Sequence, residues 1–516
     1  MKKILFSTMA LLAFFSANAG YRAMFMKDGV VTSHDKIENV AGYYLSDGVI
    51  KMLPVNSESD AIESHQLASV DSLLFTNDTV RITFNPNNTT TIDNPLYEFG
   101  LYVLPTNMVF GGSGMEYYFD DFKSSSSRIL VAETSNFDLK DVTFVLSGSC
   151  TDGQVIFSSN KRFNVILDNL SLTSADGPAL YSANSTMNLS VTDGSVNKIC
   201  DTAGSFDYVS YEIVNADNDT LCSINDTVTS ALYSKDQILI SGNGELNVTS
   251  FKGHGIQTKD YVDVQGATVN ITSSGDGIHA GDYFKMDSGV LKVNSYADAI
   301  DAGDSIVVEG GSVYAVLDSS DTRGFKTDSS IVVRNCDYIY IDMYGDGCRG
   351  FKSNTVDVYG GKIEILMHNV DPYGTDETKG VGIKADSDVK FYGGNTFIYA
   401  DGKSKEVRGV QTDADIYAYA DANVGAFMAS AKGKTWCFKA SNVYVPAISE
   451  VEFELNDSAA YPFTSSYIQT ASDDDSTVTM LFKMYSSNVY AGFNTSNAKY
   501  SASSSGFVDA KVSVIP

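Results

Sequence analysis

The chain has 516 residues, with 64 Asp and Glu against 36 Lys and Arg, and a formal net charge of −28. A protein this acidic is a poor ligand for nucleic acids and for anionic membrane surfaces, so we expect no nucleic-acid partner. The charge favours divalent cations and neutral ligands, unless basic residues gather locally.

The first 19 residues predict a secretory signal peptide. Lys2 and Lys3 precede an apolar run, and Ala17-Asn18-Ala19 supplies the small residues of a cleavage site. No later stretch approaches the roughly 20 apolar residues that a membrane helix requires. We therefore expect an exported monomer without membrane insertion, in the periplasm, at the cell surface or outside the cell.

Residues 20–134 predict an N-terminal leader module followed by a small β cap. The leader ends in the strand-like run 70–75, and further strand-like runs such as 80–84 alternate with Asn-rich and Ser-rich turns. We expect the β element to cover the first coil of the fold that follows, because an open coil is an unpaired sheet edge.

A short phrase recurs from residue 231 onward. It places a small residue before an apolar anchor and an acid or amide a few positions later, as in Gly255-Ile256-Gln257-Thr258-Lys259-Asp260. Self-similarity of this period marks a solenoid, whose units bury their apolar faces only by stacking. The anchors are Leu232, Ile256, Ile278, Ile300, Phe325, Phe351, Ile383 and Val410.

Short runs that alternate apolar and polar residues follow the anchors, for example 261–264 and 338–341, and they end at Gly-Gly or Asn-Gly turns. We predict an all-β protein, a right-handed parallel β-helix over residues 135–440 with three short strands per coil. A leucine-rich repeat has a similar period, but its Leu-x-x-Leu-x-Leu pattern is missing. Residues 441–516 predict a C-terminal β cap or a small β module.

The six cysteines are too few to staple a chain of this length. Cys200 and Cys222 bracket an insertion between two coils and could form a disulfide. Cys336 and Cys348 are either core thiols or a second bridge.

Acidic residues gather on the middle coils. Equivalent positions of successive coils stack about 4.8 Å apart, so side-chain columns can be read by counting from the anchors. Carboxylates at this spacing repel by roughly 3 to 4 kcal/mol at an effective dielectric of about 20, which calls for a cation or raised pKa values. Hard oxygen ligands suit Ca²⁺, although capping of turns in water is the alternative. The predicted calcium ligands are Asp276, Asp298, Asp301 and Asp321.

A second acidic column contains Asp236, Asp260, Asp282 and Asp304. We interpret its members as solvated turn residues.

The phrases at 253–260, 274–282 and 297–304 resemble those of the calcium-dependent carbohydrate-binding β-helix proteins. The resemblance covers about residues 140–400. That family is similar in fold to the pectate lyases of polysaccharide lyase family 9, binds acidic and cellulosic polysaccharides, and is regarded as non-catalytic. The resemblance implies that Asp276, Asp298 and Asp301 bind calcium, while His254 and Ala299 depart from the repeat.

Basic residues follow the acids on the later coils, as fixed positive charges that could bind the carboxylates of a polyuronate. The alternative is that each one pairs with a neighbouring acid such as Asp328 or Asp386 in an exposed salt bridge. In a lyase, Lys326 would be the base that abstracts the proton α to a uronate carboxylate. The predicted ligand-binding residues are Arg323, Lys326, Arg349, Lys352 and Lys384.

Outward-facing tyrosines such as Tyr283 and Tyr359 are further candidates, since their ring faces could carry sugars. Ordinary strand packing is the alternative.

Three functions fit these patterns. The first is an exported calcium-dependent protein that binds acidic or plant cell-wall polysaccharides. The second is a calcium-dependent polyuronate lyase, and the third is a surface or adhesion solenoid without a sugar site. The sequence is more typical of a binding protein than of an enzyme.

Overall fold

A computed structural model describes most of the chain. The described residues are 21–46, 48–55, 64–105, 113–118, 127–134, 137–175, 177–202, 208–214, 220–369, 379–402, 406–429, 434–446, 465–473, 476–485, 488–494 and 508–515. The predicted signal peptide at 1–19 lies outside these residues.

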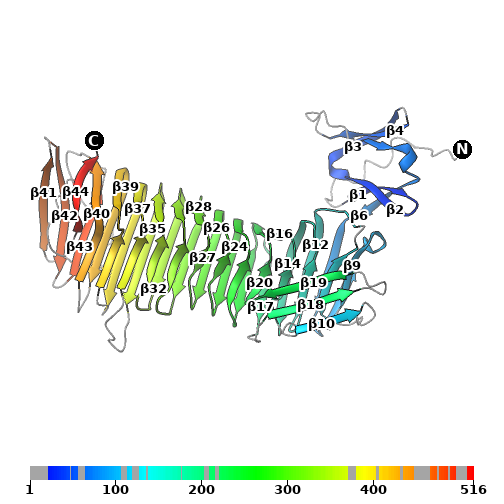
Figure 1. Ribbon diagram of the computed structural model, residues 1–516, viewed down its shortest axis with the longest axis horizontal. Helices are drawn as coiled ribbons and strands as arrows, with labels where there is room; N and C mark the ends of the chain where they lie inside the picture. The colour runs from blue at the N-terminus through cyan, green and yellow to red at the C-terminus, as the bar shows by residue number, and fades with distance from the viewer. Residues whose placement is uncertain are drawn as a thin grey trace.

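The chain winds into a parallel β-solenoid of about 11 turns, which runs along the long axis of the molecule (Figure 1). The predicted parallel β-helix is therefore confirmed. Each full coil contributes a strand segment to each of three sheets, because the backbone bends three times between one anchor strand and the next.

Sheet A carries the anchors and is paired in parallel throughout. It contains β11 (Arg128–Glu133), β13 (Gln154–Ser158), β15 (Leu180–Ser182), β20 (Ser230–Ser234), β23 (His254–Thr258), β25 (Ile278–Ala280), β27 (Ile300–Ala302), β30 (Arg323–Thr327), β33 (Arg349–Ser353), β36 (Lys379–Ala385), β38 (Glu406–Gln411) and the start of β40 (Lys434–Pro446).

Sheets B and C form the other two faces of the solenoid, and several long strands pass from one to the other. The long strands are β12 (Val142–Cys150), β14 (Phe163–Ser174), β24 (Val262–Ser273), β26 (Tyr283–Ser295), β37 (Val389–Gly402) and β39 (Asp415–Ala429). Sheet B also contains β16 (Met187–Val191), β21 (Ile238–Gly242), β28 (Ser305–Val308), β31 (Ser330–Val333) and β34 (Thr355–Val358). Sheet C also contains β17 (Val196–Asp201), β22 (Glu245–Ser250), β29 (Ser312–Leu317), β32 (Cys336–Met343) and β35 (Gly361–Asn369).

A small antiparallel module precedes the solenoid and stands at its N-terminal end (Figure 1). It contains β1 (Tyr21–Lys27), β2 (Val30–Lys36), β3 (Val40–Ser46), β4 (Val49–Pro54), β5 (Ser64–Gln66) and β6 (Ser72–Asn77), with short 3₁₀ turns at Ile37–Asn39 and Leu67–Ser69. A buried salt bridge joins the module to the first coil. Arg22 Nε donates to Asp78 at 2.6 Å, and the same guanidinium donates to the carbonyl of Lys140.

The first coil is covered by three strands that follow this module. They are β7 (Thr79–Asn85), β8 (Thr89–Asp93) and β9 (Leu101–Pro105), and a 3₁₀ turn at Tyr97–Phe99 lies between β8 and β9. Strand β7 pairs in parallel with β12, whereas β9 pairs antiparallel with β11. A separate three-stranded sheet contains β10 (Ser113–Tyr118), β18 (Tyr208–Val214) and β19 (Thr220–Thr227).

At the other end, antiparallel strands lie on the last coils. Strand β43 (Asn488–Asn494) pairs with β39 and with β42 (Ser476–Tyr485), which pairs in turn with β41 (Ser465–Asp473). Strand β44 (Val508–Ile515) continues the parallel pairing of β40.

The anchors form one continuous apolar column inside the solenoid. Ile256, Ile278, Ile300, Phe325 and Phe351 are in register from coil to coil, and all are fully buried. The rings of Phe325 and Phe351 stack with centroids 4.9 Å apart. This stacking explains why the repeat has an apolar residue at this position in every coil.

The small residue before each anchor is required by close backbone approach. A Cβ added at Gly350 would lie 2.4 Å from the carbonyl oxygen of Gly382 in the next coil and 2.5 Å from Ile365. At Gly277 it would lie 2.3 Å from Val293 and 2.6 Å from the carbonyl oxygen of Ala299. The carbonyl of the next coil and the apolar column of sheet C therefore leave little room at this position.

Five cysteines, Cys150, Cys200, Cys336, Cys348 and Cys437, are buried free thiols. Cys336 and Cys348 are therefore core residues rather than a bridge. Cys200 is likewise free, so the possible Cys200–Cys222 disulfide is not formed. Among the described residues, no helix is long and apolar enough to cross a membrane.

We predict that Gly350→Val destabilises the solenoid by about 1–3 kcal/mol or more, because the branched side chain must displace a carbonyl or Ile365. The midpoint of urea unfolding measures this change. Thr355→Val, on sheet B of the same coil, is the matched control and should leave the midpoint almost unchanged. Equal midpoints for the two variants would contradict this explanation of the small residue.

Candidate functional site

The outward residues of sheet A form the candidate site. Pairing between the strands places Gln257, His279, Asp301, Lys326 and Lys352 in one column, which continues to Lys384 and Gln411. This is the column predicted by counting one residue on from each anchor. Its charge changes along the solenoid from histidine through acid to lysine.

A second column lies two positions before the anchors, where the side chains of His254, Asp276 and Asp298 each accept a backbone N–H from the next coil. The backbone N–H of Asp276 donates to Nδ1 of His254 at 3.1 Å, and that of Asp298 donates to the carboxylate of Asp276 at 2.9 Å. The backbone N–H of Arg323 donates to the carboxylate of Asp298 at 2.8 Å. One oxygen of each aspartate therefore has a structural role.

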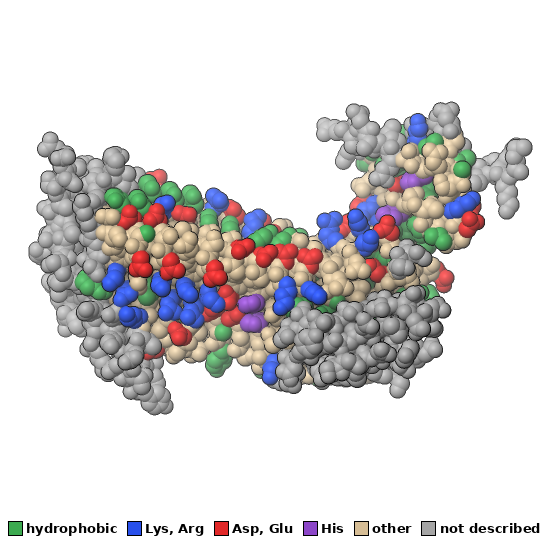
Figure 2. Space-filling view, in the orientation of Figure 1, with side chains coloured by type: hydrophobic (Ala, Val, Ile, Leu, Met, Phe, Trp, Pro, Cys, Tyr) green, Lys and Arg blue, Asp and Glu red, His purple; other side chains and the backbone are tan. Residues whose placement is uncertain are grey.

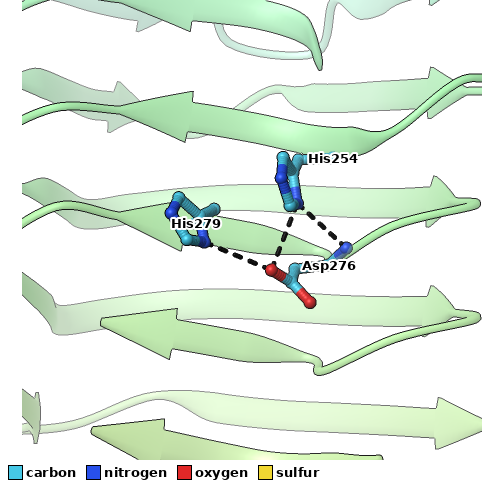
Figure 3. A group of neighbouring side chains, drawn as sticks. All are labelled: His254, Asp276 and His279. Atoms are coloured by element: carbon cyan, nitrogen blue, oxygen red, sulfur yellow. Dashed lines mark hydrogen bonds and ion pairs between the residues drawn. The ribbon is translucent and has the colours of Figure 1, made fainter. Parts of the chain in front are cut away.

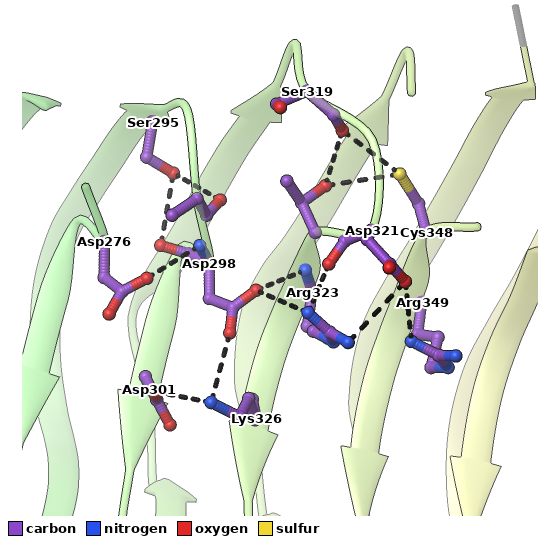
Figure 4. Close-up of polar contacts among 12 residues, drawn as sticks. Asp276, Ser295, Asp298, Asp301, Ser319, Asp321, Arg323, Lys326, Cys348 and Arg349 are labelled. Carbon is purple, nitrogen blue, oxygen red and sulfur yellow. Dashed lines mark hydrogen bonds and ion pairs between the residues drawn. The ribbon is translucent and has the colours of Figure 1, made fainter. Parts of the chain in front are cut away.

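The structure brings Asp276, Asp298 and Asp301 together, but it places cationic side chains among them (Figure 4). The ammonium of Lys326 lies 2.7 Å from Asp301 and 3.5 Å from Asp298. Nδ1 of His279 lies 3.2 Å from Asp276 and 3.6 Å from Asp301. The repulsion expected between stacked carboxylates is thus offset by side chains of the protein itself.

Asp321 does not join the other three acids. Its carboxylate is 69% exposed and lies 3.7 Å from Arg323 and 3.5 Å from Arg349. Arg323 also reaches Asp298 at 3.8 Å, so a guanidinium stands between Asp321 and the rest of the cluster (Figure 4).

The environments of these acids move their pKa values in opposite directions. Burial, reinforced by the neighbouring charge of Asp276, raises the pKa of Asp298 to about 6. Burial also acts to raise the pKa of Asp276, but hydrogen bonds with His254 and His279 outweigh it and hold the pKa well below its usual range. Hydrogen bonds with Asp276 and Asp301 raise the pKa of His279 to about 9. At neutral pH the cluster therefore holds charged ion pairs.

Lys326 lies in an environment that keeps it protonated. Burial acts to lower its pKa, but the hydrogen bond to Asp301 and the nearby charges of Asp298 and Asp276 raise it above the ordinary value. A general base works best when its pKa is near the working pH. This environment suits Lys326 to binding a carboxylate rather than to abstracting a proton.

Beyond Lys326 the outward face of sheet A becomes basic, and Figure 2 shows blue side chains gathered in a band beside the acidic cluster. Arg349 contacts the exposed Asp321, and Lys384 lies 3.7 Å from Asp386, which is 64% exposed. Lys352 has no ion-pair partner among the described residues. Exposed pairs of this kind contribute little, so these cations remain available to a ligand.

The tyrosines stack on one another. Tyr261 and Tyr283 stack with centroids 4.4 Å apart, and Tyr359 and Tyr392 stack at 4.5 Å. The guanidinium of Arg334 lies 5.3 Å from the ring centroid of Tyr359. At least one face of each ring is therefore already covered by a neighbour, which favours the strand-packing alternative for Tyr283 and Tyr359.

The predicted ligand set lacked His254 and His279, although both contact Asp276. The signal that could have found them is the same counting from the anchors, because His254 lies two positions before Ile256 and His279 one position after Ile278. The prediction missed them because it considered only oxygen ligands, and the imidazole of histidine offers nitrogen.

The comparisons with known proteins bear on this part of the chain. Residues 139–305 match the model of a family described as "carbohydrate-binding domain-containing protein". The predicted resemblance to carbohydrate-binding proteins is confirmed for this segment, which includes His254 through Asp301.

One curated relative carries the same description and comes from Acetivibrio thermocellus. It is 23% identical over 175 residues, which are 33% of this chain and 57% of the relative. A solved structure described as a polysaccharide lyase-like protein from C. thermocellum, in a gadolinium derivative, matches 55% of this chain and 96% of its own, with 18% identity and a TM-score of 0.39.

The second acidic column generates a pH prediction. Burial and hydrogen bonds shared with Asp282 and Asp236 raise the pKa of Asp260 to about 6. The folded protein therefore holds this proton at a pH where the unfolded chain has lost it, so the stability contribution falls as the pH rises from about 4 to 6. Above about pH 6 the carboxylate of Asp260 is ionised in both the folded and the unfolded state, and its repulsion in the folded state lowers the stability by a constant amount.

We predict that Asp260→Asn stabilises the protein at pH 8 by a few tenths to about 1 kcal/mol, after allowance for solvent screening, and has little effect near pH 4. Urea unfolding at both pH values measures the difference. Asp328→Asn removes an exposed carboxylate and should show no such pH dependence. A variant that is equally stabilised at both pH values would contradict the assignment.

Proposed function

We propose that this protein binds acidic polysaccharides along the outward face of sheet A. The observation that carries the proposal is the stack of Lys326, Lys352 and Lys384 in three successive coils, with Arg323 and Arg349 in the neighbouring column. A linear polyuronate carries one carboxylate per sugar, so a row with one basic side chain per coil presents charges that match it. Arginine and lysine at such positions form charge-assisted hydrogen bonds with carboxylates.

The family match supports the same reading, because it concerns carbohydrate binding and covers the coils next to this row. We also propose that the protein is exported, on the basis of residues 1–19.

Calcium dependence is a separate proposal. Asp276, Asp298 and Asp301 supply the carboxylate oxygens that Ca²⁺ prefers, but Lys326 already contacts two of them. We propose that Ca²⁺ binds these acids only in competition with the Lys326 ammonium. When bound, the ion would neutralise the acids, and Lys326 would then be free to contact a ligand.

We predict that the double variant Lys352→Ala/Lys384→Ala binds polygalacturonate at least tenfold more weakly than the wild-type protein, since a hydrogen bond to a charged group contributes about 1.5–3 kcal/mol. Affinity electrophoresis or calorimetry measures the change. The wild-type affinity should also fall with added salt.

Two controls make this test specific. Lys292→Ala removes an exposed lysine from sheet C and should leave binding unchanged. Fully methyl-esterified pectin has the same backbone without the charge and should bind weakly. Equal binding of both polymers would reject an acidic ligand, and no binding of any glycan would favour the adhesion alternative.

We predict that Lys326→Met lowers the melting temperature in the presence of a chelator, because Asp301 and Asp298 lose their cation. Added Ca²⁺ should restore much of the loss and should stabilise this variant more than the wild-type protein. Lys352→Met, one coil further along the same column, is the control and should not gain a calcium response. If Ca²⁺ changes the melting temperature of neither the wild-type protein nor Lys326→Met, the calcium proposal fails. Polysaccharide binding is tested independently.

A further inference from the structure

Two histidines from successive coils face one buried carboxylate (Figure 3). His254 begins β23, His279 lies in the middle of β25, and Asp276 lies in the turn between β24 and β25. Nδ1 of His254 and Nδ1 of His279 each lie 3.2 Å from the same Oδ2 of Asp276. One ligand atom from each of the three residues lies within 4.8 Å of the other two.

The stacking of the coils creates this arrangement. The imidazole rings of His254 and His279 are nearly parallel, with centroids 4.7 Å apart and an interplanar angle of 22°. In the later coils, the corresponding positions hold Arg323 and Lys326. The two histidine coils therefore offer imidazole nitrogens, which bind a metal ion once they lose their protons, where the later coils offer the fixed positive charges of Arg323 and Lys326.

The distances fit a tetrahedral metal ion. Zn²⁺ binds imidazole nitrogen at about 2.0–2.1 Å and carboxylate oxygen at about 2.0–2.2 Å, so two of its ligands lie about 3.3 Å apart. Both N···O separations to Asp276 are 3.2 Å. A metal ion at this place would need the two imidazole nitrogens at the same spacing, which rotation of one imidazole ring can supply.

The surroundings supply orientation and access. The other oxygen of Asp276 accepts the backbone N–H of Asp298 at 2.9 Å, which fixes the carboxylate in the way that outer hydrogen bonds fix metal ligands. The side chains of His254 and His279 are 21% and 37% exposed, whereas that of Asp276 is 11% exposed. An ion could therefore enter from solvent and keep one coordination position open.

We propose that His254, Asp276 and His279 bind Zn²⁺ or a similar divalent transition-metal ion. Two imidazoles and one carboxylate are ligands that suit Zn²⁺, Co²⁺ and Ni²⁺, whereas Ca²⁺ selects sets of six to eight oxygens. Metal binding replaces the hydrogen bond from the backbone of Asp276 to His254. Protons compete for the same nitrogens, so binding tightens as the pH rises.

Metal titration without any glycan tests the proposal. The chelator-treated full chain is titrated with ZnCl₂ by calorimetry and with CoCl₂ by visible absorption. One equivalent of Zn²⁺ should bind, Co²⁺ should give the intense absorption of a tetrahedral site, and Zn²⁺ should raise the melting temperature. A stoichiometry well below one, or only the faint absorption of hexahydrated Co²⁺, would overturn the proposal.

Variants locate the site. His254→Asn and His279→Gln should each weaken Zn²⁺ binding at least tenfold, and Asp276→Asn should do the same if it folds. His368→Gln is the matched control, because His368 also contacts a carboxylate, that of Asp342 at 3.3 Å, but lies on sheet C. Melting curves without metal check the folding of each variant. Unchanged Zn²⁺ affinity in both histidine variants would sink the assignment, whatever the outcome of the polysaccharide experiments.

Discussion

Parallel hydrogen bonding between coils is the constraint on which the rest of this structure depends. It places residue upon residue at each position, so every side chain meets the equivalent side chain of the next coil. Apolar columns gain from this arrangement, as the stacked rings of Phe325 and Phe351 show. The same arrangement destabilises a column of like charges, because these charges then lie within a few ångströms of one another.

Around the acidic cluster, the outward face of sheet A resolves this conflict by changing residue type from coil to coil, whereas the lysines of the later coils stack like on like. His279, Asp301 and Lys326 follow one another in a single column, so each charge has an opposite neighbour above or below. In the column two positions before the anchors, one carboxylate oxygen of Asp276 and one of Asp298 each accept a hydrogen bond from a backbone N–H of the next coil. A ligand or ion that binds here must therefore replace ion pairs and hydrogen bonds that the protein already makes.

Much of the architecture could be predicted from the sequence, because the repeat expresses it directly. The spacing of the anchors predicts the coils, and counting from Ile278 or Ile300 places His279 and Asp301 in the column that the pairing shows. The small residue before the anchor follows from a distance between backbones, which a single sequence records only as Gly or Ala.

The composition of the acidic cluster was harder to predict. Counting gives neighbours along a column, but it does not say how far a long side chain reaches across columns. Lys326 reaches back one coil to Asp301 and across to Asp298, and Arg323 separates Asp321 from the other acids. These contacts depend on rotamers and on competition among several cations, and neither is written in the repeat.

The buried salt bridge at the N-terminal end has a consequence for how the molecule comes apart. Arg22 is 1% exposed and Asp78 is 3% exposed, so neither charge has water as an alternative partner. If the leader module melted on its own, Asp78 would be left as a bare charge against the first coil, which is strongly unfavourable. The module and the first coils should therefore melt as one cooperative block, because a chain that loses residues 21–77 keeps Asp78 without Arg22 beside it.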